Sequence, residues 1–260
     1  MINLQSNRAK QQYLFYVDRQ MNVFEIGFTK RLNTALRKQW KTIADFVEMG
    51  SFDVDHVLNV TFAFFSEIFK NHYKRVYFLF GTIIFNQLKE QEKSSLSYER
   101  KTIKDDYLEV MKDWAERYMA EQIIVINKTT KKQIASVIEK GMLEGISNRE
   151  IAKQIIQLSD SINLKRAIRI ARTETHTVAM KSTNEAMTST GLEFSKEWIS
   201  ANDSRTRHGA FNHVAANGEI VKKDQLYVRT GEALQYPGDA ERGSAGNIIH
   251  CRCVEIYHTV

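Results

Sequence analysis

The position of the only proline is the feature that most limits what this chain of 260 residues can fold into. That proline is Pro237, close to the C-terminus. Proline interrupts helices because its ring fixes φ and removes a backbone hydrogen-bond donor. The long stretch before Pro237 lacks such breaks, and its first part repeats apolar side chains at the three- and four-residue spacing of a helix face. We therefore predict long, uninterrupted helices.

Polar breaks and glycines set the bounds of the predicted helices. Gly50 ends the first helix, and Asp53 or Asp55 can cap the second. Ser147 and Glu150 have the spacing of a capping box at the start of a later helix. The predicted helices cover residues 3–48, 55–91, 98–125, 130–140 and 148–158, followed by a helix that Asp160 or Ser161 caps and that runs to Met187.

The pattern changes beyond Gly191, where two sets of side chains alternate over residues 194–200 with the period of a strand. Further strand candidates lie at 219–222, 225–228 and 251–257. We predict an α+β fold, in which a long N-terminal helical region precedes a small mixed α/β C-terminal domain with a short β-sheet. The predicted domains are residues 1–125 and 126–260, the second with helices over 130–190 and a small α+β part over 191–260.

Basic residues are unevenly distributed along the chain. The formal net charge is +6, yet residues 128–172 alone hold ten lysines and arginines against four acidic residues. Such an excess can contact nucleic acid by releasing counterions from phosphates, and it is also common on a solvated helix face. The candidate nucleic-acid contacts are Lys128, Lys131, Lys132, Lys165, Arg166 and Arg169.

The C-terminal part gathers the rare residue types of the chain: both cysteines, the proline and four of the seven histidines. On a strand, Cys251 and Cys253 would point both sulfurs to one face. Three interpretations of this pair are open. The cysteines can be small buried side chains that fix the last strand in the core. They can bind a structural zinc ion together with His208 or His213. A disulfide between them is the third, although so short a loop would be strained.

Charged residues that follow the first predicted strand form a second constellation. Asp203 can accept the backbone amides of its turn, and Arg205 and Arg207 can clamp a carboxylate or a phosphate. Arg172 and Glu174 lie two positions apart on a helix, so they do not face each other. Each is either a surface charge or the partner of another element, for which we expect the loop that holds Asp203 and Arg205.

An enzymatic alternative uses the histidines of this region. A metal-dependent nuclease would place His208, His213, Asn217 and His250 around a divalent ion. The sequence has neither the H-x-E nor the H-N-H spacing, and no residue stands out as the base that would generate a nucleophile. We therefore name no catalytic residue, and we expect no cofactor beyond the zinc alternative.

Export and membrane insertion are not expected. The N-terminus lacks the regions of a signal peptide, and no apolar run approaches the roughly 18–20 residues that span a bilayer. Two closely spaced cysteines are not the disulfide framework of a secreted protein. We expect synthesis in the cytoplasm and no membrane partner.

Six motifs occur in order in the C-terminal half. They are Ala171-Arg-Thr-Glu-Thr175, Glu197-Trp198, Asp203-Ser-Arg-Thr-Arg207, His213-x₃-Asn217-Gly218, Gly231-Glu-x-Leu-x-Tyr-Pro-Gly-Asp239 and Ser244-Ala-Gly-Asn247-x₃-Cys-Arg-Cys253. Together they resemble the MuF-type phage head morphogenesis family of minor head proteins, over roughly residues 130–260. His250 stands where that family usually has asparagine.

The resemblance implies an architectural role for the matched residues, which are Arg172, Glu174, Trp198, Asp203, Arg205, Arg207, His213, Gly218, Pro237, Asp239, Asn247, Cys251, Arg252 and Cys253. It implies a minor head (minor capsid) protein of a phage or prophage, located in the virion or the procapsid interior. The implied partners are the portal, to which residues 1–125 would dock, the capsid and scaffold proteins, and double-stranded DNA. The alternative functions are a metal-dependent nuclease and a DNA-binding protein acting on the phage genome.

Overall fold

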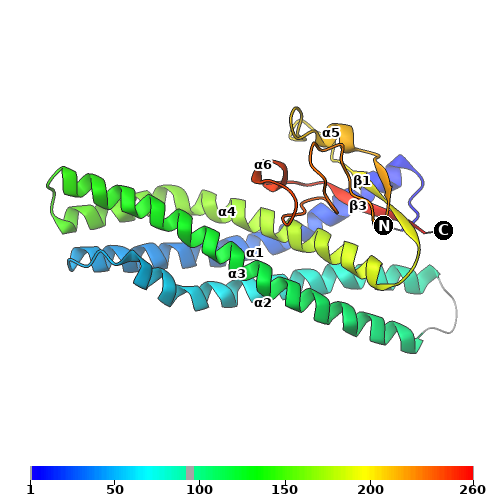
Figure 1. Cartoon of the computed structure of the whole chain (residues 1–260), viewed down its shortest axis with the longest axis horizontal. Coiled ribbons are helices and arrows are strands. Elements are labelled where there is room, and N and C mark those ends of the chain that lie inside the picture. Colours follow the sequence, from blue (N-terminus) through cyan, green and yellow to red (C-terminus); the bar gives the residue numbers. More distant parts are fainter. Residues whose placement is uncertain (1, 92–96, 260) are drawn as a thin grey trace. The chain divides into compact units, whose positions relative to one another are not determined.

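A computed structural model describes residues 2–91 and 97–259 of the chain (Figure 1). Four long helices come first: α1 (Asn7–Glu48), α2 (Val54–Gln91), α3 (Ser97–Leu143) and α4 (Asn148–Ser189). A smaller part follows, with β1 (Phe194–Ile199), α5 (His213–Ala216), β2 (Ile220–Lys222), α6 (Ala245–Ile248) and β3 (Val254–Thr259). The predicted α+β class is confirmed. The predicted polar break between the second and third helices includes residues 92–96, which lie outside the described residues.

The chain divides into two compact units. The sheet unit comprises Met1–Glu25, Tyr73–Asp113 and Arg172–Val260, and the helical unit comprises Ile26–His72 and Trp114–Ala171. The predicted domain boundary between residues 125 and 126 lies within α3. A docking role for residues 1–125 stays a prediction.

An apolar core to which all four long helices contribute holds the helical unit together. Its buried members include Trp40 of α1, Val57 of α2, Ile138 of α3 and Ile155 of α4. Burying a side chain of this size contributes roughly 1.5–3 kcal/mol. The apolar residues that recur every three and four positions along these helices therefore form this core.

Two of the long helices run through breaks that the sequence predicted. The predicted divisions between 98–125 and 130–140 and between 148–158 and the last helix are wrong, because α3 and α4 are each continuous. Hydroxyl groups at these places bond back to their own helix: Thr130 Oγ1 donates to the carbonyl of Ile126 at 3.0 Å, and Ser161 Oγ to that of Leu158 at 2.8 Å. Helix packing outweighs the weak preference of these residues for caps.

The predicted cap of α2 is present, and α4 has the Ser147 half of the predicted capping box, whereas the Glu150 carboxylate accepts from Lys153 at 3.0 Å. The backbone N–H of His56 donates to Asp53 Oδ1 at 3.0 Å, and that of Glu150 to Ser147 Oγ at 3.3 Å. Gly145 makes the turn between α3 and α4 with φ +63°, a left-handed conformation that glycine adopts without strain. Both helix starts thus satisfy backbone donors that would otherwise lack partners.

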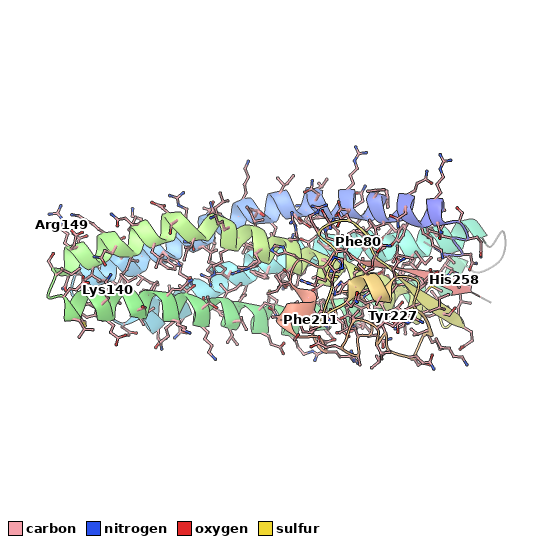
Figure 2. All side chains as sticks on the ribbon, turned by 90° about the horizontal axis from the view of Figure 1, so that it is seen from above. Phe80, Lys140, Arg149, Phe211, Tyr227 and His258 are labelled. Atoms are coloured by element: carbon pink, nitrogen blue, oxygen red, sulfur yellow. The ribbon has the colours of Figure 1, made fainter. Side chains whose placement is uncertain are left out.

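The sheet unit contains a three-stranded antiparallel sheet in the order β2-β1-β3 (Figure 1). Trp198 of β1 lies opposite Glu255 of β3. The N-terminal segment extends the sheet, because Ile2 forms a parallel bridge with Tyr257. Glu197 of β1 is buried and accepts from Lys10 at 2.7 Å and from His258 (labelled in Figure 2) at 2.8 Å.

Two of the strand predictions need correction. Residues 225–228 do not form a strand; Tyr227 makes only an isolated bridge to Leu234. The last strand begins at Val254, so Cys251 and Cys253 precede β3 and do not lie on it. The predicted strands at 194–200 and 219–222 correspond to β1 and β2.

The second half of α4 supports the small α+β part within the sheet unit. Asn184 Nδ2 donates to Glu255 Oε1 at 3.1 Å, and Thr177 Oγ1 donates to the carbonyl of Gly238 at 3.0 Å. Burial raises the pKa of Glu255, and its carboxylate is also held by the Tyr257 hydroxyl at 2.5 Å. These polar contacts fix the sheet and the loop before α6 onto one helix.

Membrane spans were not expected from the sequence. Over residues 2–91 and 97–259, no helix has the length and apolar character that crossing a bilayer requires.

Candidate functional site

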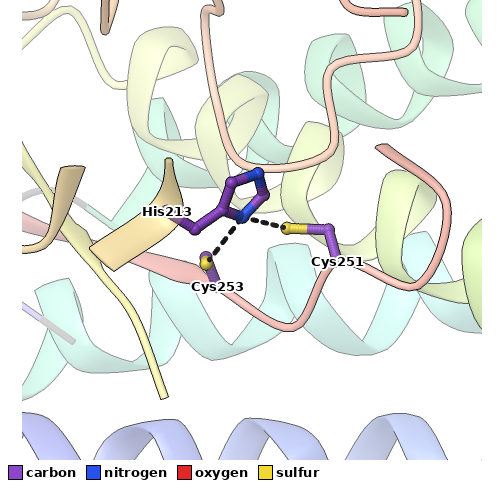
Figure 3. A group of neighbouring side chains, drawn as sticks. All are labelled: His213, Cys251 and Cys253. Carbon is purple, nitrogen blue, oxygen red and sulfur yellow. Dashed lines mark hydrogen bonds between the residues drawn. The ribbon is translucent and has the colours of Figure 1, made fainter. Parts of the chain in front are cut away.

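His213, Cys251 and Cys253 meet inside the sheet unit (Figure 3). All three side chains are buried, and their donor atoms lie within 4.8 Å of one another. His213 Nδ1 is 3.3 Å from Cys253 Sγ and 3.7 Å from Cys251 Sγ. Both cysteines are free, so they do not form the disulfide that was one of the three interpretations. The sequence offered two histidines for this cluster; His213 is the one that joins it, whereas His208 is exposed.

The start of α5 sets the position of His213. Asn212 caps this short helix, accepting from the backbone N–H of Ala215 at 2.9 Å, and the His213 N–H donates to the carbonyl of Arg207 at 3.1 Å. On the other side, Ser200 Oγ donates to the His213 carbonyl and lies 3.5 Å from Cys253 Sγ. Hydrogen bonds at the start of α5 and from Ser200, just after β1, therefore hold His213 in place.

Asn247 fixes the orientation of the imidazole. Its Oδ1 atom lies 2.6 Å from His213 Nε2, and its Nδ2 donates to Glu232 Oε2 at 3.0 Å and to Thr230 Oγ1 at 3.3 Å. Two acceptors on the amide nitrogen leave the amide oxygen to face the ring, so His213 Nε2 carries the proton. In the neutral ring with this tautomer, the lone pair of Nδ1 faces both sulfurs.

An ion pair holds the loop after β1 against the Cys-Arg-Cys segment. Arg252 Nη2 donates to both carboxylate oxygens of Asp203, at 2.7 and 2.9 Å. The Arg205 guanidinium also contacts this carboxylate, at 3.0 Å. Hydrogen bonds from Arg252, and then from Arg205, hold the pKa of Asp203 well below its ordinary value. The Arg207 guanidinium reaches the carbonyls of Asn247 and Ile249, so each arginine of the motif has an internal partner.

A small cavity of about 90 Å³ adjoins the cluster. Its walls include all three cluster residues, and the remaining wall is largely polar. His250 also lines it, with a left-handed backbone at φ +61°. Asparagine tolerates this conformation better than most residues do, which agrees with the asparagine usual at this place in the family that the sequence resembles. A cavity of this size has room for water beside the sulfurs.

The two thiols are electrostatically unequal. Burial raises the pKa of Cys251 well above its ordinary value. Burial acts in the same direction on Cys253, but the hydrogen bonds and charge of the surrounding Cys251, His213 and Ser200 together outweigh it, and the pKa of Cys253 falls well below its ordinary value.

Arg172 and Glu174 have partners other than the expected ones. Arg172 Nε donates to Glu25 of α1 at 3.3 Å. Tyr73 of α2 donates to Glu174 Oε2 at 2.5 Å, and both side chains are buried. The prediction that the Asp203 loop supplies their partners is wrong, because α1 and α2 contact this part of α4 instead.

The other matched residues shape loops of the sheet unit. Trp198 is fully buried and donates through Nε1 to Ser200 Oγ at 3.2 Å. Gly218, at φ +78°, turns the chain so that its N–H donates to the Trp198 carbonyl at 2.8 Å. Pro237 is buried, and the buried Asp239 accepts from the backbone N–H of Gln235 at 2.9 Å. Each of these residues makes its contacts within the sheet unit; a structural role for them stays a prediction.

The candidate nucleic-acid contacts divide into two groups. Arg166 is buried in the helical unit, where it donates to Thr130 Oγ1 at 2.8 Å and to the Ile126 carbonyl at 2.6 Å. It is therefore not accessible to DNA in this structure. The exposed members are Lys128, Lys131, Lys132, Lys165 and Arg169.

Several residues of the site carried no signal in the sequence. Ser200 contacts both His213 and Cys253, and Thr230 helps to orient Asn247. His176 of α4 is buried, and its Nε2 lies 2.8 Å from the Cys253 carbonyl. Burial lowers the pKa of His176. These contacts depend on the tertiary fold, so spacing along the chain could not reveal them.

The chain thus has an α+β fold, and its C-terminal half contains a His-Cys-Cys cluster and an Asp-Arg ion pair. Residues 132–256 match the family described as Phage Mu protein F like protein. This part of the chain is similar to that family, as the ordered motifs indicated. The family suggests a phage head-related protein, with capsid-assembly partners and a virion or procapsid location. Neither the curated proteins nor the solved structures contain a match to this chain.

Proposed function

We propose that this protein is a minor head protein that takes part in procapsid assembly at the portal, inside the procapsid, and that its role is structural rather than catalytic. The observation that carries the proposal is the family match over residues 132–256, which includes the whole His213, Asn247 and Cys251–Cys253 network. Each residue of that network has an internal partner, as expected of an architectural module.

Exposed apolar side chains on the first helices support a docking role for residues 1–125. Within the helical unit, Val60 and Phe64 of α2 are 66% and 44% exposed. They line a groove of about 310 Å³ with Phe46 and Val57, and Lys38 lies over the Phe64 ring with 5.5 Å between its Nζ and the ring centroid. A surface with exposed large apolar side chains is typical of a protein interface.

Co-expression with the portal protein of the same phage genome tests the proposal. We expect the two proteins to co-elute in size exclusion, with mass analysis confirming a ring that carries this chain. The double substitution of Val60→Glu and Phe64→Glu should abolish co-elution while the helical circular dichroism is kept. The matched control is Ile220→Glu with Val228→Glu, at two exposed positions of the sheet unit. A chain that elutes alone would contradict portal association, and co-elution of the first variant would move the docking surface elsewhere.

A nuclease is the alternative against which the structural role must be tested. Incubation with plasmid and Mg²⁺ or Mn²⁺ should leave the DNA intact. Cleavage that EDTA stops and that co-purifies with the wild-type chain would contradict the structural role.

A second candidate function is contact with packaged DNA, and the exposed basic side chains of the helical unit support it. Lys128, Lys132, Lys165 and Arg169 are exposed on α3 and α4 of the helical unit. Lys131 is also exposed, but it pairs with Asp55 at 2.5 Å. Exposed basic side chains are the groups that exchange counterions with DNA phosphates.

A further inference from the structure

The donor atoms of His213, Cys251 and Cys253 converge on one point within the sheet unit (Figure 3). Thiolate sulfur and imidazole nitrogen are the donors that zinc prefers, and they distinguish it from the oxygen-seeking magnesium and calcium. The cluster joins residues far apart in the sequence, since His213 lies 38 and 40 positions before the two cysteines. Its assembly is a property of the fold and not of one short loop.

The distances fit a tetrahedral ion. Zinc binds sulfur at about 2.3 Å and nitrogen at about 2.0–2.1 Å, and tetrahedral angles then separate a nitrogen from a sulfur ligand by about 3.5–3.6 Å. His213 Nδ1 lies 3.3 Å from one sulfur and 3.7 Å from the other, on either side of that value. Each nitrogen–sulfur distance therefore differs from the tetrahedral value by only about 0.1–0.3 Å.

The hydrogen bonds around the imidazole prepare Nδ1 as a ligand. Asn247 accepts the proton of Nε2 at 2.6 Å, and Glu232 and Thr230 hold the amide of Asn247 in that orientation. A metal-binding histidine usually donates its other N–H to such a fixed acceptor. The lone pair of Nδ1 is then available at the sulfurs without any rearrangement.

The cavity of about 90 Å³ beside the cluster has all three residues in its walls. Water fits there. We propose that His213, Cys251 and Cys253 bind one zinc ion, with a water molecule from this cavity as the fourth ligand. The ion fastens α5 to the segment that precedes β3, in a part of the chain where β2 has only three residues. The sheet unit is then more resistant to unfolding with zinc than without it.

Metal analysis of the full-length chain tests the proposal directly. Protein purified without chelator should contain one zinc ion per chain, and removal of the ion should lower the melting temperature, which added Zn²⁺ should restore. Both thiols should react with a thiol reagent only after chelation. A chain that is isolated without zinc and takes none up in a Zn²⁺ titration would overturn the proposal.

Single substitutions locate the ion. Cys251→Ser, Cys253→Ser and His213→Asn should each reduce the bound zinc to a small fraction of the wild-type content. His208→Asn is the matched control, because this histidine is exposed in the same part of the chain, and it should keep one ion. Full zinc content in all three cluster variants would place the ion elsewhere and overturn the proposal.

Cobalt gives a result that does not depend on how the variants fold. Co²⁺ added to the metal-free wild-type chain should produce the intense visible bands of a tetrahedral ion and thiolate-to-cobalt charge transfer in the near ultraviolet, and Zn²⁺ should abolish both. Weak octahedral bands without thiolate charge transfer would contradict the assigned ligands.

Discussion

Arg252 donates to both carboxylate oxygens of Asp203, at 2.7 and 2.9 Å, and it does so from the position between the two cysteines. The pair couples the loop after β1 to the segment before β3. The arginine side chain is 17% exposed and the aspartate 35% exposed. Solvent screening therefore weakens the pair, although less than it weakens a fully exposed one.

The first prediction concerns this ion pair. Asp203→Asn should lower the free energy of unfolding at neutral pH by about 1 kcal/mol, a value below the usual range for a charged hydrogen bond because the carboxylate is partly exposed. The pKa of Asp203 is lowered by the Arg252 hydrogen bond, so the stabilisation is fully present above the unfolded-state pKa. It is lost as the pH falls below about 3.9 toward the lower folded-state pKa.

Urea unfolding of the wild-type and variant chains, followed from neutral pH to about pH 3, measures this difference. It should be constant in the neutral range and shrink below about pH 4. Asp113→Asn, at an exposed position of α3, is the control and should show a much smaller difference. A difference for Asp203→Asn that persists at the lowest pH would mean that a change of shape, and not the removal of charge, explains it.

The second prediction concerns Arg166, which is buried without an acidic partner among its hydrogen bonds to Thr130 and Ile126. Burial lowers the pKa of Arg166 to about 10, so it remains charged at neutral pH. Arg166→Ala should lower the free energy of unfolding by about 2–3 kcal/mol, because it removes two hydrogen bonds and leaves a cavity. Arg166→Met fills most of that space without a buried charge, and it should cost clearly less.

Urea unfolding of both Arg166 variants at neutral pH gives the comparison. Equal losses for the methionine and the alanine variants would show that the guanidinium hydrogen bonds, and not the packing of the side chain, carry its contribution.

Part of the fold could be predicted from the sequence. Apolar spacing and the absence of proline before Pro237 predicted long helices, and the caps at Asp53 and Ser147 were visible as local patterns. The sequence did not predict that α3 and α4 are each continuous. Thr130 and Ser161 resemble helix ends in sequence, but their hydroxyls bond to the preceding helical turn while neighbouring apolar residues pack.

The candidate site was predictable in its residue types but not in its pairings. The motifs pointed to Asp203, Asn247 and the two cysteines, and the structure brings them into one region. Choosing His213 over His208 required the position of α5, which spacing does not give. The partners of Arg172 and Glu174 could not be found either, because they come from α1 and α2, which carry no matching motif.

The third prediction tests the orienting role of Asn247 in the proposed zinc site. Asn247→Ala leaves all three ligands in place but removes the acceptor of the His213 Nε2 proton. The zinc affinity should fall by about 10–100-fold, while a saturating concentration still loads one ion per chain. Competition with a chromophoric chelator measures the affinity.

A loss of stability alone would not change this affinity, and a second asparagine provides the control. Asn163 is buried in the helical unit and donates to Ser159 Oγ at 2.7 Å. Asn163→Ala should destabilise the chain yet keep the wild-type zinc affinity. An unchanged affinity for Asn247→Ala would show that this residue does not position the ligand.

The last prediction separates DNA contact from a solvated helix face. The wild-type affinity for double-stranded DNA, measured by fluorescence anisotropy, should fall steeply as salt increases. Substituting glutamine at Lys128, Lys132, Lys165 and Arg169 should flatten the slope of log affinity against log salt, by up to about 0.9 for each phosphate that the variant no longer neutralises.

A control of equal charge uses four exposed basic residues of α1, which are Arg8, Arg19, Lys30 and Lys41. Their glutamine variants remove the same net charge, so a general effect of charge would flatten both slopes equally. A flatter slope confined to the α3 and α4 variant would place the DNA-binding surface on these helices, because counterion release depends on the groups that touch the phosphates. An unchanged slope in that variant would place any DNA-binding surface elsewhere and leave these residues as a solvated face.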